Sequence, residues 1–175
     1  MRGCTSVRVA ESSGRGEARR QAVLLAEAIG FQLEQTGKIA LVVTELAGNL
    51  VKHTRGGGHV FLSRIERAGG CGIEVVAVDS GEGIPDPDHA LRDGFSTAGT
   101  PGTGLGAVAR LSHSFELFST DAGTVATARI WRDAPPDLRE PRVEAAGVCS
   151  MMDGQPVAGD DFAVVEDGDR IRLAV

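Results

Sequence analysis

Two pairs of strands joined by tight turns constrain the fold more than any other feature of this sequence. HVFLSRIER (59–67) and CGIEVVAVD (71–79) flank a glycine turn, and FELFST (115–120) and TVATARIW (124–131) flank the turn residues 121–123. Strands that follow one another through tight turns pair antiparallel, and helices then cover one face of the sheet. The sequence therefore predicts an α+β fold, a two-layer α/β sandwich whose mostly antiparallel mixed sheet carries helices on one face.

Helical segments are expected before and between these strand pairs. Apolar residues recur at helical spacing in GEARRQAVLLAEAIGF and in GKIALVVTELAGNLVKHT, and the glycines at 56–58 end the second of these segments. The other predicted elements are a strand at 6–10, helices at 16–31 and 37–54, a polar glycine-rich connection at 80–103 and a short helix at 104–113.

Composition predicts one complete domain and part of a second. The chain has 175 residues, of which 42% are apolar, so residues 1–131 contain enough apolar residues to form a core. Residues 132–142 are proline-rich and charged, as in a linker. Residues 143–175 contain an alternating pattern around an Asp-Gly turn, which predicts an incomplete second domain or a β-hairpin extension.

Charge and cysteine content exclude several classes of function. A net charge of −6 without a basic cluster argues against a nucleic-acid partner, and no apolar run has the length of a membrane span or a signal peptide. The three cysteines are widely spaced and form no CxxC pair, which favours neither a disulfide framework nor a metal site. These features predict a cytoplasmic protein without a membrane or nucleic-acid partner.

The stretch GTPGTGLGA (99–107) is typical of a loop that contacts phosphates. Its glycines fit the dinucleotide pattern G-x-G-x-x-A, with Glu116 or Asp121 as the downstream acid, but no strand precedes the first glycine. No Lys-Ser or Lys-Thr follows the glycines, so a Walker loop is excluded as well. We interpret the stretch as a flexible flap whose backbone N–H groups close over phosphates.

One face of the helix at 37–54 groups four polar side chains beside its apolar stripe. Glu45, Asn49, Lys52 and His53 lie at i, i+4, i+7 and i+8, so they share that face. One interpretation is an ordinary solvated helix surface. The other is a chemical set, with a carboxylate for proton abstraction, an amide oxygen for Mg²⁺ and cations for phosphates.

The segment VVAVDSGEGIPD places a carboxylate at the end of an apolar strand. Gly81 and Gly83 after Asp79 permit a close approach of the backbone to a ligand. Asp79 is suited to accept a hydrogen bond from an exocyclic amine such as that of adenine. A turn aspartate that caps the following N–H groups is the alternative.

These three motifs, in this order, resemble a known ATP-binding fold. The E-x-x-x-N-x-x-K-H pattern at 45–53, D-x-G-x-G-I at 79–84 and G-T-G-L-G-A at 102–107 resemble the GHKL or Bergerat fold of gyrase, histidine kinases and MutL. The segment TELAGNLVKH and the short lid make the sequence similar to the RsbT/RsbW group. The members of that group are anti-sigma-factor-type serine/threonine kinases of bacterial partner switching. The resemblance covers residues from about Val7 to Trp131.

The resemblance implies a role for each polar residue of the helix. Glu45 is the expected general base, Asn49 the expected Mg²⁺ ligand, and Lys52 and His53 are expected to face the phosphates of ATP. His59, His89 and His113 match nothing in the family pattern, and we expect them to be surface or packing residues. The expected lid residues are Gly102, Thr103, Gly104, Leu105 and Gly106.

The adenine site implied by the resemblance lies on the strands. Asp79 is expected to hold the adenine amino group, with Gly83 beneath the ring and Gly81 and Ile84 beside it. Thr124 is expected to support this site from a late strand.

The implied activity is transfer of the ATP γ-phosphate to a serine or threonine of a STAS-domain antagonist, with ATP and Mg²⁺ as cofactors. Two alternatives remain open on the same residues: an ATP-gated module that holds a sigma factor or scaffold without turnover, and an ATPase. A weak homodimer is also left open.

The tail resembles, over a short stretch, the opening strands of a PPM-type serine phosphatase of the SpoIIE/RsbX kind. The resemblance rests on Gly159, Asp160, Phe162 and the hairpin pattern, and solvated turn residues are the alternative. In that phosphatase family, a strand like the one at 171–175 leads into an Asp-Gly metal motif, and this sequence ends before reaching one. We therefore expect no phosphatase activity, and we expect fast hydrogen exchange beyond Pro141.

Overall fold

The chain divides into two compact units, Met1–Pro136 and Asp137–Val175. The computed structural model describes residues 4–67, 70–91, 104–133, 163–167 and 170–174. The boundary between the units falls inside the segment predicted as a linker. Each unit is described by itself below.

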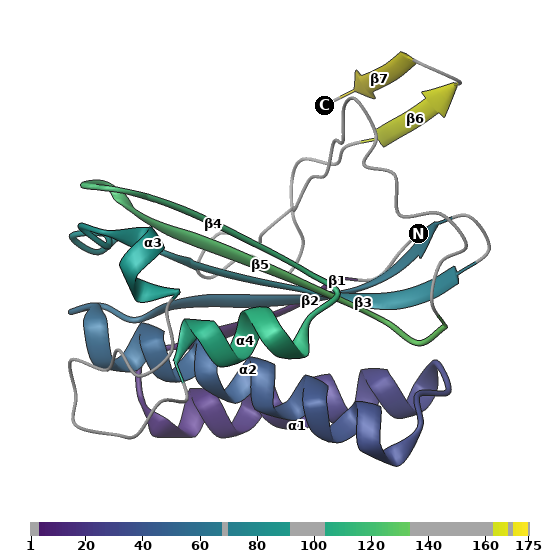
Figure 1. The fold of residues 1–175 in the computed structure, drawn as a ribbon, viewed down its shortest axis with the longest axis horizontal. Helices are drawn as coiled ribbons and strands as arrows, with labels where there is room; N and C mark the ends of the chain where they lie inside the picture. The colour runs from purple at the N-terminus through teal and green to yellow at the C-terminus, as the bar shows by residue number, and fades with distance from the viewer. Residues whose placement is uncertain (1–3, 68–69, 92–103, 134–162, 168–169, 175) are drawn as a thin grey trace, which may run out of the picture. The chain divides into compact units, whose positions relative to one another are not determined.

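The first unit is built on a five-stranded sheet with the strand order β1-β2-β3-β5-β4, and every pairing in it is antiparallel (Figure 1). This arrangement confirms the predicted α+β class. The strands are β1 (Cys4–Val9), β2 (Gly58–Arg67), β3 (Gly70–Asp79), β4 (Ser114–Thr120) and β5 (Gly123–Trp131).

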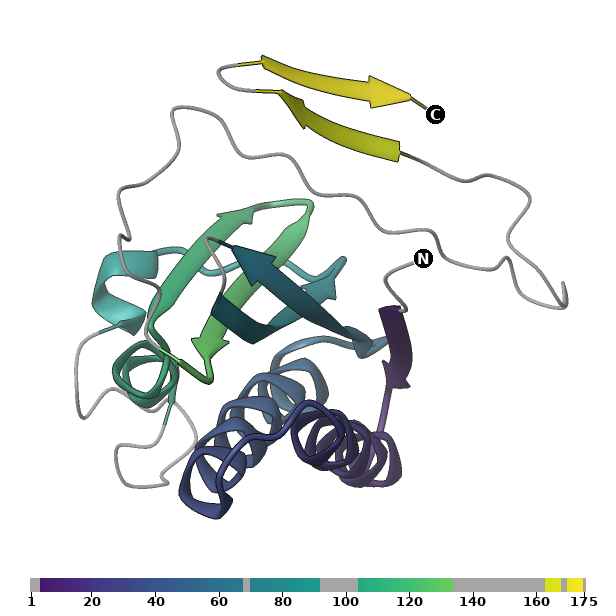
Figure 2. The same cartoon turned by 90° about the vertical axis from the view of Figure 1, so that its right-hand side faces the viewer.

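Three helices, α1 (Ser12–Ala28), α2 (Leu33–His53) and α4 (Leu105–Leu111), lie on the same face of this sheet (Figures 1 and 2). The buried residues of α1 are alanines, so its backbone can lie close to its neighbours, while α2 inserts larger side chains. The buried large residues of α2 are Ile39, Val42, Val43, Leu46 and Leu50, and those of the strands include Val60, Leu62, Ile73 and Val75.

Helices α1 and α2 begin four residues earlier than predicted, at Ser12 and Leu33 rather than at 16 and 37. The start of α2 is stabilised by a capping box, in which the Gln32 N–H donates to Gln35 Oε1 at 3.1 Å. The glycines in the first turns are tolerated there because their cost in a helix is only about 1 kcal/mol each.

The connection predicted at 80–103 contains a short helix that the sequence pattern did not indicate. This helix is α3 (Pro87–Ala90), and Asp86 caps it by accepting a hydrogen bond from the His89 N–H at 2.9 Å. The Asp-Pro pair was the available signal, since Asp is a favoured N-cap and Pro a favoured first helical residue.

In the second unit, β6 (Ala163–Asp167) and β7 (Arg170–Ala174) pair antiparallel, which confirms the predicted hairpin. Gly159, Asp160 and Phe162 lie outside the described residues. The phosphatase resemblance therefore remains a prediction. Within the described ranges, no helix combines the length and apolar character needed to cross a bilayer.

The glycine turn between α2 and β2 yields a prediction about stability. Gly57 has φ +69°, and a Cβ there would lie 2.1 Å from the Val9 carbonyl oxygen, whereas a Cβ on Gly56 would meet nothing within 4 Å. We expect Gly57→Ala to lower the free energy of unfolding by at least about 1–3 kcal/mol, from backbone strain and overpacking.

The matched control is Gly56→Ala, which we expect to change the free energy of unfolding by less than about 0.5 kcal/mol. Denaturant unfolding monitored by circular dichroism measures both variants. Equal effects of the two substitutions would contradict the steric explanation.

Candidate functional site

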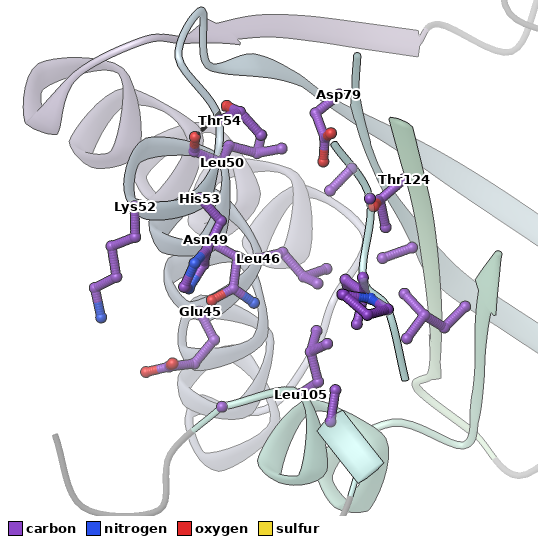
Figure 3. Close-up of a pocket in the computed structure, with 18 of the residues that line it drawn as sticks. Glu45, Leu46, Asn49, Leu50, Lys52, His53, Thr54, Asp79, Leu105 and Thr124 are labelled. Carbon is purple, nitrogen blue, oxygen red and sulfur yellow. Dashed lines mark hydrogen bonds between the residues drawn. The ribbon is translucent and has the colours of Figure 1, made fainter. Parts of the chain in front are cut away.

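A pocket of about 390 Å³ lies between α2 and the strand ends of β3 and β5 (Figure 3). Residues from the α3 region and from the start of α4 also line it. The pocket brings together most of the residues that the sequence singled out. Those that line it are Glu45, Asn49, Lys52, His53, Asp79, Gly83, Ile84, Gly104, Leu105 and Thr124.

Two of the described residues that the sequence singled out do not line the pocket. Gly81 and Gly106 lie near the pocket in sequence but are not among the residues that line it. Gly102 and Thr103 of the predicted lid lie outside the described residues.

The polar face of α2 forms one wall of the pocket, as the helical spacing predicted. Leu46 and Leu50 of α2 are buried and line the pocket, and Asn49 lies between them in the chain and lines it too. Figure 3 shows Glu45 and Lys52 extending from α2 away from the strands that carry Asp79 and Thr124. The wall therefore offers an amide near the centre of the pocket and charged groups at its rim.

Burial raises the pKa of the Glu45 carboxyl above its ordinary value, and the positive charges of Lys52 and then Arg15 act in the opposite direction. A partly desolvated carboxylate holds a proton more readily than an exposed one, which suits it to accept a proton from a reacting hydroxyl. Arg15 is an exposed residue of α1, and sequence reasoning missed it because only the packing of α1 against α2 brings it near.

Asp79 is the last residue of β3, and its role as the cap of the following turn is confirmed, whereas its contact with adenine stays a prediction. Its Oδ1 accepts a hydrogen bond from the Gly81 N–H at 2.8 Å, so it caps the turn that follows. The same side chain lines the pocket, directly opposite Thr124 in the β3–β5 register.

Gly83 is required by the backbone, independently of any ligand. It has φ +72°, and a Cβ there would lie 1.9 Å from the Thr120 carbonyl oxygen at the end of β4. The loop after β3 therefore approaches the β4–β5 turn closely, and this contact holds one side of the pocket in place.

Sequence reasoning missed the apolar lining that surrounds the polar groups. These residues are Leu46, Leu50, Ala77, Leu117 and Ala126, with Pro85 and Ala90 from the α3 region. They come from separate elements, so no local pattern marks them as one surface. Apolar walls with a few placed polar groups are typical of pockets that bind small molecules or cofactors.

Two of the three histidines that we expected to be surface or packing residues are outside the pocket. His59 stacks on Phe61, with ring centroids 6.0 Å apart, and His113 Nδ1 accepts a hydrogen bond from the Trp131 N–H at 3.1 Å. His89 instead lines the pocket, together with Asp86. The signal that could have found His89 was the Asp86 cap that forms α3.

The oxygen atoms that line the pocket suit a metal ion whose other ligands are water molecules and the phosphates of a nucleotide. Within the described residues, no cluster of three or more His, Cys, Asp or Glu side chains could hold a metal. The Asn49 amide oxygen is a single hard ligand, and Mg²⁺ keeps several waters and binds substrate phosphates besides one or two protein groups. The pocket thus fits Mg²⁺ bound jointly by Asn49 and a polyphosphate.

Comparisons with known proteins identify related sequences and a related fold. The chain is 35% identical over 115 residues to the serine/threonine-protein kinase RsbT of Bacillus subtilis (strain 168), an alignment that covers 65% of this chain and 86% of RsbT. A crystal structure of the RsbU and RsbW domains of Rv1364c from Mycobacterium tuberculosis aligns with a TM-score of 0.53 at 16% identity, over 75% of this chain and 34% of that one.

The low identity of that structural match makes it evidence for the fold alone. The family of the histidine kinase-like ATPase domain matches residues 10–130, which span the sheet, the helices and the pocket of the first unit. This chain belongs to the histidine kinase-like ATPase domain family.

Proposed function

We propose that this protein is an ATP-dependent serine/threonine kinase of the partner-switching type, which transfers the γ-phosphate of ATP to a hydroxyl of a STAS-domain partner. The observation that carries the proposal is Glu45, a carboxylate with a raised pKa on the pocket wall, one helical turn from Asn49. The RsbT relative, which is named a serine/threonine-protein kinase, supports the same activity.

The shape of the pocket suggests how ATP binds. Adenine occupies the more apolar end of the pocket, where Asp79 accepts a hydrogen bond from the adenine amino group and Thr124 faces it from β5. The phosphates extend along α2 toward Asn49, Lys52 and His53. Gly81 and Ile84 shape the loop beside the base, and residues 102–106 close over the phosphates.

Phosphoryl transfer depends mainly on positioning and on charge stabilisation. Asn49 would hold Mg²⁺ together with the phosphates, and the ion would supply neutralisation of the phosphate charge. Lys52 and His53 steady the phosphates, and Glu45 accepts the proton of the attacking hydroxyl. The acceptor hydroxyl enters at the rim, where Glu45 extends from α2 away from the strands. ATP and STAS-domain partners place this activity in the cytoplasm.

A non-catalytic module, in which ATP binding controls whether a sigma factor is held, would use the same pocket without a general base. Glu45 favours the kinase, because placing a carboxylate where burial raises its pKa has a cost that a binding module has no reason to bear. An ATPase would use the same residues, and it differs only in that a water molecule, not a protein hydroxyl, enters at the rim as the phosphate acceptor.

The first test of the proposal concerns Glu45 as the general base. Glu45→Gln removes the proton acceptor but keeps the shape of the side chain, so we expect Mg²⁺-ATP affinity within about twofold of wild type and phosphate transfer slower by about 10²–10⁴-fold. Asn49→Ala, one turn away, should instead weaken Mg²⁺-dependent ATP binding itself.

Isothermal titration calorimetry and transfer of labelled phosphate to STAS-domain proteins measure the two effects separately. If Glu45→Gln transfers phosphate at the wild-type rate, or if wild type phosphorylates no STAS partner, the gating module replaces the kinase as the assignment.

The raised pKa of Glu45 also sets the sign of a pH effect on stability. Because the folded pKa lies above the unfolded value, the contribution of Glu45 to stability is fully present below the unfolded pKa and is lost as pH rises through the folded pKa. We therefore expect Glu45→Gln to gain stability relative to wild type as pH rises from about 4 to 8. Thermal unfolding of both proteins without nucleotide measures this, and a gain by wild type over the same range would contradict it.

A third test concerns the end of the pocket that is proposed to bind adenine. Asp79→Asn keeps an oxygen for the Gly81 N–H, so the turn should survive, but its amide can place a donor where the adenine amino group needs an acceptor. We expect ATP affinity to fall by about 10-fold or more, since a buried polar mismatch costs about 1–3 kcal/mol. Unchanged calorimetric affinity, in a variant with wild-type thermal stability, would contradict the placement of adenine.

A further inference from the structure

Asp86 lines the pocket, and neither the adenine end nor the phosphate end accounts for it. The residue stands just before α3, where its Oδ1 accepts a hydrogen bond from the His89 N–H at 2.9 Å. Its second carboxylate oxygen, Oδ2, makes no hydrogen bond to any residue that the structure describes. One oxygen therefore holds the short helix, and the other is available to a ligand.

The chain on both sides of Asp86 is anchored. The Ile84 N–H donates to Ser119 Oγ at 2.7 Å, and Ala90 packs against the core. The Asp86 side chain itself is exposed, so it lies at the open edge of the pocket. Its position is thus set by the protein alone, and a group placed in advance binds a ligand at a lower cost in ordering.

Charge decides which part of ATP can lie against Asp86. A carboxylate at contact distance repels a triphosphate, and the proposed path of the phosphates follows α2, whereas α3 packs against β4. The adenine amino group is assigned to Asp79, which is a different carboxylate at the end of β3. Between the base and the phosphates, the hydrogen-bond donors of ATP are the two hydroxyls of the ribose.

We propose that Asp86 is a specificity-determining residue whose Oδ2 accepts hydrogen bonds from the ribose 2′- and 3′-hydroxyls, so that the site favours ribonucleoside triphosphates over their deoxy counterparts. The inference rests on the proposed function, since it assumes that ATP extends from Asp79 to α2. Acidic side chains bind ribose hydroxyls in dinucleotide-binding folds, so the pairing is chemically suitable. A charged acceptor also makes a stronger hydrogen bond than a neutral one.

The test compares ATP with 2′,3′-dideoxy-ATP, which lacks both hydroxyls but keeps the base and the triphosphate. Isothermal titration calorimetry on the full 175-residue chain gives the ratio of the two affinities. For wild type we expect ATP to bind about 5- to 30-fold more tightly, as hydrogen bonds to an exposed charged acceptor allow.

Asp86→Asn separates sugar binding from the support of α3. Asparagine caps a helix as well as aspartate does, so its oxygen can keep the His89 N–H, while an NH₂ group replaces the second acceptor. We expect the preference for ATP to fall below about threefold. Asp86→Ser, which also caps but carries no carboxylate, should give the same loss, and it serves if the first variant does not fold.

The matched control is Glu82→Gln, on the same loop. Glu82 is exposed and does not line the pocket, so this variant removes one negative charge without removing the proposed contact. Loss of either charge can tighten both nucleotides, but that effect cancels in the ratio because both carry the same triphosphate. We therefore expect Glu82→Gln to keep the wild-type preference.

Three results would count against the inference. If Asp86→Asn and Asp86→Ser keep the wild-type ratio, Asp86 only caps α3 and the inference is overturned. Equal binding of ATP and its dideoxy analogue by wild type would overturn this inference alone and leave the proposed function standing. If wild type binds no adenine nucleotide, the proposed function falls and this inference falls with it.

Discussion

The rotation of α2 about its own axis is the constraint on which the site depends. Ile39, Val43 and Leu46 are essentially inaccessible to solvent between α2 and the sheet, and burying each such side chain contributes about 1.5–3 kcal/mol. A helix held by that stripe cannot turn without exposing it. Because side chains recur at about 100° per residue, the face with Glu45 and Asn49 must then border the pocket.

The second constraint is the pairing of β3 with β5. It sets Asp79 directly opposite Thr124, and it leaves β4 at the edge of the sheet, where Ser119 can reach Thr124 from behind. The loop after β3 is held by the Ile84 N–H bond to Ser119 and by the close approach of Gly83 to Thr120. The end of the pocket that contains Asp79 and Thr124 is therefore held in place by several contacts, whereas Lys52 and His53 lie at exposed positions of α2.

Local patterns predicted much of this protein correctly. Helical spacing placed Glu45 and Asn49 on one face of α2, and the turn residues placed both strand pairs and the terminal hairpin. The errors also have physical causes. The start of α2 was missed because Gly37 masked the glutamine capping box before it, and the start of α1 was missed because Gly14 and Gly16 interrupt the helical pattern there. Helix α3 was missed because a single helical turn has no periodicity to detect.

The sequence by itself determined the longer helices and the strands, apart from their exact ends, and the face of α2 that carries the polar residues, because these depend on interactions between residues close in the chain. Only the tertiary structure decided that β5, not β4, lies beside β3, that His89 and the apolar residues line one pocket, and that Arg15 acts on Glu45. Such contacts join residues far apart in the chain. They are set by which packing of the whole core buries the most apolar surface while pairing the strand backbones, and no local window of sequence carries that information.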